Sequence, residues 1–416
     1  MFEKLHSVYP ELYGQNYSEE EMDARFSSLC IKHKELFGIE NPMLFSAAGR
    51  SEIAGNHTDH NLGLVLGATI NLDTIAAVSK RDDDTVILSS EGFDECRINF
   101  SELVMKEEEK QTTNALIRGI ARAFKDRGIK IKGWQANTST NVLKGSGLSS
   151  SAAIEMLCAE IFNSLYNDDA LDAIELAKIG QFAENAFFGK PSGLLDQICC
   201  AHGKIVGIDF KDKENPIVTP LNVDFSSFGY SIVITDTKGD HANLTPEYAA
   251  VPSEMRAIAE YYGKENLRDV DPETFFHDIP KLRKYAKNDR AILRAYHYFT
   301  ENSRVISMLD HLNKGEIASY LALVKESGNS SYRFLQNAYP QSMPQMQGIS
   351  IAIACSERVL KDEGAVRVHG GGFAGTIQAY VPDKLLNEYI QTMESLFGEN
   401  CSTVVSIRRK PVSRIY

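Results

Sequence analysis

The stretch Gly145-Ser-Gly-Leu-Ser-Ser-Ser151 has the composition of a loop that binds an anion. Glycines let a backbone approach a phosphate closely, and the apolar spacing over residues 152–165 predicts that a helix begins directly after the loop. Free N–H groups and the positive end of a helix dipole favour a phosphate there. The stretch matches neither the Walker nor the Rossmann pattern, so on its own it predicts either a phosphate site or an ordinary helix start.

A second polar cluster, Gly55-Asn-His-Thr-Asp-His60, follows Arg50 at the end of a strand-like run. His57, Asp59 and His60 could ligate zinc, but no further residue at a suitable spacing completes the ligand set that zinc requires. A polar binding site for a small molecule is the alternative interpretation of this cluster.

The elements that must position these residues are helices and strands in irregular alternation. Apolar spacing predicts helices over 5–40, 114–128, 171–188 and much of 254–337, and strands over 43–48, 134–140, 231–235, 375–381 and 402–407. The runs between Leu64 and Leu88, separated by a polar turn, predict a meander or hairpin. An α+β protein is therefore expected, not a doubly wound sheet.

Length and composition limit the function classes. A chain of 416 residues exceeds one ordinary core and predicts two domains, for which we place a boundary between 1–210 and 211–416. The net charge of -12 argues against nucleic acid and anionic membranes as partners. The basic run Arg408-Arg-Lys410 is interpreted as a solvated surface, and the seven cysteines as reduced thiols. We expect a cytoplasmic monomer.

Three separated blocks together resemble the galactokinases of the GHMP kinase superfamily. They are Ala48-Gly-Arg50 continued by residues 55–60, the loop at residues 145–151, and Val368-His-Gly-Gly-Gly-Phe-Ala-Gly375. They occur in the family's order over most of the chain. The resemblance implies the two-domain GHMP kinase fold, with ATP and a sugar meeting in the cleft between the domains, and phosphorylation of the sugar's anomeric hydroxyl.

The resemblance also implies roles for the residues that match the family's motifs. Asp196, in a Gly-x-x-Asp-Gln motif, would accept the proton of the sugar hydroxyl, with Arg50 beside it and the γ-phosphate. Mg²⁺ would be held by Ser151 and Glu184, since it takes few protein ligands. The further candidates for ATP binding are Gly145, Ser146, Gly147, Leu148, Ser149, Ser150 and Ser90, and those for sugar binding are Asn56, His57, Thr58, Asp59, Gly193 and Tyr248.

The sequence departs from the family pattern near the sugar. The family usually has Asn at the position of Glu52, Glu at Asn56 and Tyr at His60, and tends to carry basic residues where this chain has Asp240, Val251 and Pro252. A neutral amide at Asn56 would not repel a carboxylate, so galacturonate is an alternative substrate. A non-catalytic sugar sensor on the same fold is a second alternative, although Arg50, Ser151, Glu184 and Asp196 are all present.

Overall fold

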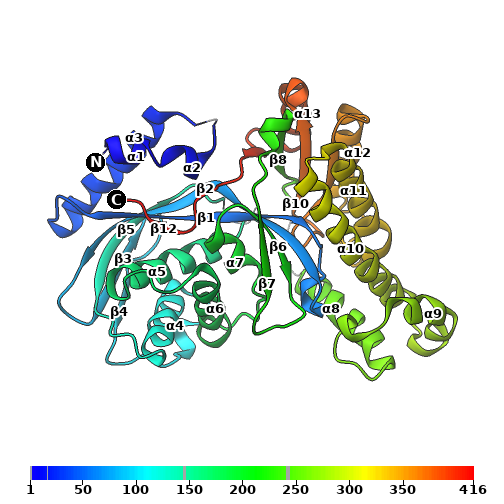
Figure 1. Cartoon of the computed structure of the whole chain (residues 1–416), viewed down its shortest axis with the longest axis horizontal. Coiled ribbons are helices and arrows are strands. Elements are labelled where there is room, and N and C mark those ends of the chain that lie inside the picture. Colours follow the sequence, from blue (N-terminus) through cyan, green and yellow to red (C-terminus); the bar gives the residue numbers. More distant parts are fainter. Residues whose placement is uncertain (1, 16, 144–146, 240–243) are drawn as a thin grey trace.

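The computed structural model describes residues 2–15, 17–143, 147–239 and 244–416, and its strands form a larger and a smaller sheet (Figure 1). The larger sheet has the order β12 (Ser413–Arg414), β1 (Met43–Ala54), β2 (Leu64–Lys80), β5 (Trp134–Thr140), β3 (Thr85–Ser90) and β4 (Cys96–Asn99). Strand β6 (Ile205–Asp209) also pairs with β2, and β7 (Ile217–Leu221) pairs with β6. The α+β prediction is confirmed.

The prediction of a meander between Leu64 and Leu88 is wrong. Strand β5 lies between β2 and β3, antiparallel to β2 and parallel to β3. The turn after β2 crosses the start of β5, where Arg81 N–H donates to Gly133 O at 3.0 Å and Gly133 N–H donates to Asp83 O at 2.8 Å. The alternation of side chains predicted each strand but carries no information on which strand becomes its neighbour.

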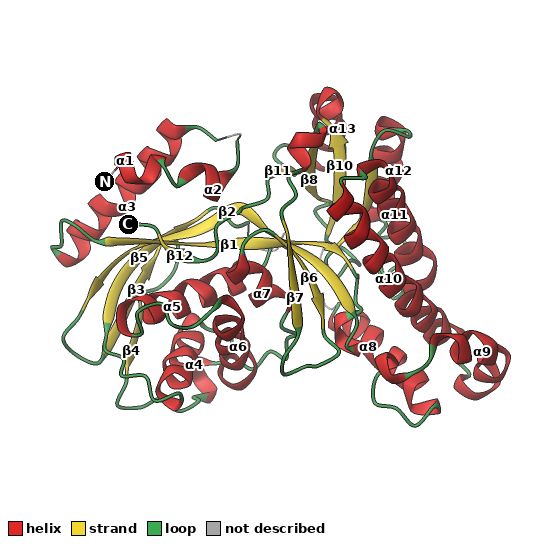
Figure 2. Cartoon of the chain, in the orientation of Figure 1, coloured by secondary structure: helices red, strands yellow, loops and turns green. Residues whose placement is uncertain are grey.

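Helices cover both faces of the larger sheet (Figure 2). On one face lie α1 (Phe2–His6), α2 (Tyr9–Tyr13) and α3 (Glu19–Phe37), and on the other α4 (Thr113–Asp126), α5 (Ser150–Tyr166), α6 (Ala173–Ala183) and α7 (Leu195–His202). Two layers of helices around one sheet bury both of its faces, which explains why β1 and β2 read as almost continuous buried runs.

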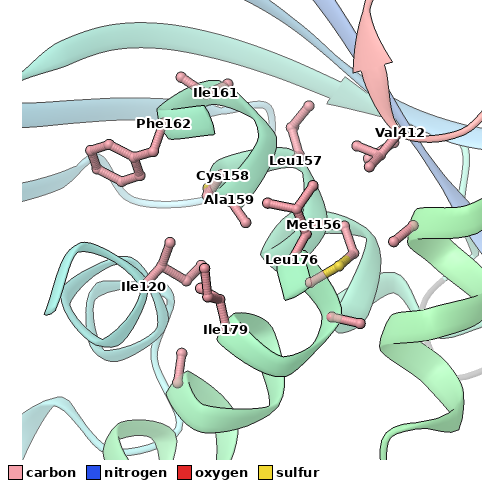
Figure 3. Packing of buried hydrophobic residues seen from close by; sticks show 14 of the residues in the cluster. Ile120, Met156, Leu157, Cys158, Ala159, Ile161, Phe162, Leu176, Ile179 and Val412 are labelled. Carbon is pink, nitrogen blue, oxygen red and sulfur yellow. The ribbon is translucent and has the colours of Figure 1, made fainter. Parts of the chain in front are cut away.

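Helix α5, which follows the candidate phosphate loop, is packed on nearly all sides. Figure 3 shows its Met156, Leu157 and Phe162 among side chains of neighbouring elements, with Ile120 from α4 and Ile179 from α6. A helix that is apolar nearly all round is buried, and its buried methylene groups each contribute about 0.8 kcal/mol. The N-terminus of α5 is therefore held firmly in place.

The smaller sheet and a set of long helices form the other part of the molecule (Figure 1). The sheet has the order β11 (Ser402–Val405), β8 (Tyr230–Asp236), β10 (Thr376–Pro382) and β9 (Ala365–His369). The helices are α8 (Thr245–Tyr261), α9 (Pro272–Ala286), α10 (Asp289–Lys314), α11 (Ile317–Ser330), α12 (Gly348–Leu360) and α13 (Leu386–Phe397). The predicted helical character of residues 254–337 is confirmed.

The interpretation of Arg408 as part of a solvated charged run is wrong. Its side chain is 0% exposed, whereas that of Arg409 is 49% exposed. The segment carrying Arg408 returns to the larger sheet, where the guanidinium donates to Ser46 Oγ at 2.6 Å and lies 3.6 Å from Asp73. Because β7 and β12 also belong to the larger sheet, the division at residue 210 stays a prediction.

The burial of the cysteines and the character of the helices bear on the predicted location of the protein in the cell. All seven cysteines lie in the described residues, and four of them, Cys158, Cys199, Cys200 and Cys401, are buried. Their reduced state stays a prediction. Within the described ranges, no helix combines the length and the apolar character that a membrane span requires. The cytoplasmic location stays a prediction.

Candidate active site

Arg50 and Asp196 form a close ion pair between β1 and α7. Arg50 Nε donates to Asp196 Oδ1 at 2.8 Å, and Nη2 lies 2.7 Å from the same oxygen. Arg50 also donates through Nη1 to the carbonyl of Gly147 in the candidate phosphate loop. Arg50 thus joins the candidate base to the loop. Sequence reasoning placed these residues together, and the structure brings them together.

Ser149 fixes the second oxygen of the Asp196 carboxylate. The residue precedes α5 with a left-handed backbone, φ 56°. Its hydroxyl donates to Asp196 Oδ2 at 2.6 Å instead of capping the helix. A non-glycine residue in this conformation costs about 1–3 kcal/mol and recurs at functional sites. Ser149, expected to bind phosphate, here orients the carboxylate that would act as the base.

The electrostatics keep Asp196 ionised. Burial raises the pKa of Asp196, but the charge of Arg50 and the hydrogen bonds from Ser149 and Arg50 act in the opposite direction, and their sum lowers the pKa below its ordinary value. The side chain remains 36% exposed, so the carboxylate can be reached from solvent. Asp196 can therefore accept a proton at neutral pH, although Arg50 makes it a weaker base.

A cavity of about 520 Å³ opens beside the start of α5, which is a volume typical of small-molecule sites. Ser150 and Ser151 of α5 line it, as does Ser90 of β3. The Ser90 hydroxyl accepts from Thr138 Oγ1 at 2.8 Å. The cavity is also lined by Phe93 and its neighbours and by Gln111, Thr112, Thr113, Asn114 and Leu116, which sequence reasoning did not single out.

Glu184 is the central residue of a buried polar network behind this site. It begins the π-helix η3 (Glu184–Phe188), so the helix predicted over 171–188 changes its hydrogen-bond pattern at the candidate metal ligand. Its Oε1 accepts from Lys190 Nζ at 3.0 Å and its Oε2 from Gln197 Nε2 at 2.8 Å. Gln197 Nε2 also donates to Glu155 Oε2 at 2.9 Å.

Ser151 and Glu184 are compatible with Mg²⁺. Both offer hard oxygen ligands, and the buried Glu184 carboxylate already holds a cation, the ammonium of Lys190, whose side chain is 58% exposed and can move away. In the described part of the chain, no three His, Cys, Asp or Glu residues cluster as a metal site. A magnesium ion would therefore take most of its ligands from phosphate and water.

The predicted sugar residues gather near the C-terminal glycine motif. Gly193 lies against Asp59, because a Cβ on Gly193 would stand 3.0 Å from Asp59 Oδ2. His57 Nε2 donates to Gly371 O at 3.0 Å, and Tyr248 Oη donates to Gly372 O at 3.1 Å. The signature loop, the segment of Gly193 before α7, and Tyr248 of α8 thus converge on one region, as the resemblance implied.

Asn56 and Thr58 differ from the other predicted sugar residues because both are fully buried. Asn56 Nδ2 donates to Glu52 Oε1 at 3.0 Å and to Gly370 O at 2.6 Å, and its Oδ1 accepts from Asn337 at 2.8 Å. Thr58 Oγ1 donates to Leu64 O at 2.7 Å. Their polar groups are thus bonded to protein, and contact of either residue with sugar stays a prediction that this arrangement does not support.

The negative charge missing at Asn56 is present at Glu52. Arg367, fully buried in β9, donates to Glu52 Oε1 at 2.7 Å and also to the carbonyl of Ile53. Burial raises the pKa of Glu52, and the charge of Arg367 acts against that rise. Relative to the family pattern, amide and carboxylate have exchanged positions, and the carboxylate joins the larger sheet to the smaller one.

The zinc alternative has no support in the described residues, where no metal cluster is found and His57 Nε2 is bonded to a carbonyl. Gly145, Ser146 and Asp240, which the sequence analysis named, lie outside the described residues. Gln197 was noted only as the end of the Gly-x-x-Asp-Gln motif. Glu155 was missed, although it is a charged residue within a strongly apolar helix.

Comparisons with known proteins identify related chains. A family model described as the galactokinase galactose-binding signature matches residues 31–80, and one described as the GHMP kinases N terminal domain matches residues 114–204. A galactokinase of Actinobacillus pleuropneumoniae serotype 5b (strain L20) is 31% identical over 357 residues, which cover 85% of this chain and 88% of the relative. One from serotype 3 (strain JL03) is 30% identical over 382 residues, covering 91% and 94%.

Solved structures show a similar fold. Lactococcus lactis galactokinase complexed with galactose superposes with a TM-score of 0.78 at 23% identity, covering 94% of this chain and 100% of that chain. Methanococcus jannaschii mevalonate kinase gives a TM-score of 0.60 at 14% identity, covering 89% and 99%. At these identities the likeness concerns the fold.

Proposed function

Because this chain belongs to the galactokinase family of GHMP kinases, we propose that it transfers the γ-phosphoryl group of ATP to the anomeric hydroxyl of galactose or a close relative, giving the sugar 1-phosphate and ADP. The protein is a phosphotransferase with an alcohol acceptor. The observation that carries the proposal is the Asp196 carboxylate held by Arg50 and Ser149 beside the start of α5.

Asp196 accepts the proton of the sugar hydroxyl as the oxygen–phosphorus bond forms. General-base help of this kind contributes about 100- to 10,000-fold. Arg50 has two opposing effects, since it lowers the pKa of Asp196 and stabilises charge on the transferring phosphoryl group. Phosphoryl transfer depends mainly on positioning and on charge neutralisation, so the second effect outweighs the first.

ATP occupies the 520 Å³ cavity, with its base toward Phe93 and its phosphates toward the N-terminus of α5. The helix dipole and the loop N–H groups favour phosphates there. Ser151 and Glu184 would hold Mg²⁺, which supplies positive charge to neutralise the phosphates. The ammonium of Lys190, which lies 3.0 Å from Glu184 Oε1, would have to give up this ion pair for the carboxylate to hold the ion.

The sugar binds among Asp59, His57, Gly193 and Tyr248. An ionised carboxylate such as Asp59 can accept from two sugar hydroxyls. Galacturonate has no specific support, because the amide of Asn56, on which that alternative rested, is turned into the protein. Asn56 and Thr58 position the loop from inside the protein. The protein acts on sugar and ATP as a cytoplasmic monomer.

The test is sugar-dependent ATP consumption by the purified protein with Mg²⁺ and, in parallel, galactose, galacturonate, N-acetylgalactosamine and glucose. The phosphorylated carbon is assigned by NMR. Galactose 1-phosphate is the expected product. Binding of ATP and galactose without turnover would favour the sensor alternative. A product phosphorylated at another carbon would show that Asp196 does not act on the anomeric hydroxyl.

A further inference from the structure

Two buried oxygen atoms next to the candidate base, Glu155 Oε1 and Gln197 Oε1, have no hydrogen-bond partner among the described residues. The two residues are 1% and 0% exposed. They already face each other, since Gln197 Nε2 donates to Glu155 Oε2 at 2.9 Å. An unsatisfied buried acceptor destabilises the folded state, and here two such acceptors flank one hydrogen bond.

The orientation of the Gln197 amide is fixed by its second partner. Nε2 also donates to Glu184 Oε2 at 2.8 Å, so both of its hydrogens are used. The reverse orientation would bring the amide oxygen against oxygens of two glutamates. Gln197 therefore has no hydrogen left for Glu155 Oε1, and an ionised Glu155 has none for Gln197 Oε1.

We propose that Glu155 is protonated and forms a two-bond acid–amide pair with Gln197, which fixes the phosphate-loop helix relative to Glu184 and to the helix of Asp196. The O–H on Oε1 donates to Gln197 Oε1 while Oε2 accepts from Gln197 Nε2. One proton then satisfies both unpaired oxygens. Glu155 is a positioning residue, since it acts through Gln197.

The groups around Glu155 favour the acid form. Burial and the negative charge of Glu184 raise the pKa of Glu155 well above its ordinary value, Asp196 adds to that rise, and the Gln197 hydrogen bond and Lys190 act against it. From α6, Gly180 packs so closely that a Cβ there would lie 3.2 Å from Glu155 Oε2. The neighbouring thiols, Cys158 of α5 and Cys200 of α7, are buried and have raised pKa values.

The proton is tested by the pH dependence of unfolding in the wild type and in Glu155→Gln, whose amide can make the same two hydrogen bonds. The unfolded chain loses the Glu155 proton near pH 4.3 but the folded chain keeps it, so wild-type stability falls as pH rises above that value. At pH values above about 5 at which the folded chain keeps the proton, Glu155→Gln should gain up to about 10-fold per pH unit in the folding equilibrium constant relative to wild type. A difference that stays constant with pH would overturn the proposal.

The positioning role is tested with Glu155→Leu, which is also neutral but cannot bond Gln197. We expect kcat to fall at least about 10-fold with little change in the KM of the sugar, and Mn²⁺ binding in the presence of a non-hydrolysable ATP analogue to weaken, while Glu155→Gln retains both. Glu160→Leu, which removes another buried glutamate of α5, is the control and should leave kcat unchanged. Equal kcat in the two Glu155 variants would exclude the role.

The positioning role rests on the proposed function, whereas the pH measurement does not. If the wild type phosphorylates no sugar, the proposed function fails, but the unfolding and Mn²⁺ measurements still decide whether Glu155 carries a proton and orders the metal carboxylate.

Discussion

The amide of Asn56 and the carboxylate of Glu52, four residues apart, are bonded to each other inside the protein at 3.0 Å. Asn56 Nδ2 also donates to Gly370 O, which a carboxylate in its place could not do. Arg367 stabilises the charge at Glu52. The exchange of the two residue types therefore keeps the charge of the region and moves it from the loop into strand β1.

Asn56→Glu alone should destabilise the protein by at least about 2 kcal/mol, because it removes two donated hydrogen bonds and places a second carboxylate beside Glu52. The double variant Glu52→Asn/Asn56→Glu should be more stable than the sum of the two single variants by at least about 1 kcal/mol. Urea unfolding measures both, with the exposed Glu265→Asn as the control. Additive effects would mean that the two residues are not coupled.

Asp196→Asn should lower kcat about 100- to 10,000-fold while ATP still binds. The pKa of Asp196 is lowered, so its stabilising effect is present at neutral pH and is lost only as pH falls below the ordinary range of aspartate, about 3.9. Wild-type kcat/KM should thus show no acid limb from this residue above about pH 4. The surface variant Asp212→Asn should keep full activity; a wild-type kcat in Asp196→Asn would exclude it as the base.

Phe93→Ala should raise the KM of ATP about 10-fold, because stacking of a base on an aromatic ring is worth about 1–3 kcal/mol. The KM of the sugar should not change, since Phe93 lines the cavity and not the region of Asp59 and Tyr248. Phe228→Ala, another exposed phenylalanine, is the matched control. An altered sugar KM with an unaltered ATP KM would place the nucleotide elsewhere.

Arg408→Ala should destabilise the protein by about 3–5 kcal/mol, since it removes the donor to Ser46 and one of the two arginines that pair with Asp73 from a buried site. The adjacent Arg409→Ala should stay within about 0.5 kcal/mol of wild type, because its side chain is half exposed. Denaturant unfolding of the two variants measures the loss in free energy of unfolding. A similar loss in both would contradict the burial of Arg408.

Acid should destabilise the protein through its buried histidines. Burial lowers the pKa of His57 to about 4, and the pKa of His297, which donates to Asn56 O, is also lowered. Between about pH 6.5 and 4 the unfolded chain binds these protons and the folded chain does not, so stability falls as pH falls. His57→Gln should reduce this slope, and the exposed His277→Gln should not.

Much of the site could be predicted because its residues lie in short motifs. Arg50, Asp196 and the loop before α5 were placed together from the resemblance, and the strand at residues 134–140 was predicted within its observed bounds. The order of strands was not predictable, because β5 is inserted between β2 and β3 by contacts distant in sequence. The alternation of residues within a strand does not specify its neighbour.

The burial of individual polar residues also could not be predicted from the sequence. Arg408 and Asn56 have the residue types of surfaces and sites, and only the surrounding elements determine that both are inside. Glu155 differs, because a glutamate among the apolar residues of α5 was visible in the sequence. The role of Glu155 could not be predicted, because its hydrogen-bond partner Gln197 lies on another helix.

Strand β12 pairs with β1, the first strand of the same sheet, although more than 350 residues separate them. During synthesis from the N-terminus, residues up to β7 emerge long before Ser413 and Arg414 are made. Until then the outer edge of β1 has an exposed row of N–H and C=O groups, which is the kind of edge that pairs with other chains. Expression of the first half alone should therefore give aggregates, and the nascent chain depends on late residues to close its first sheet.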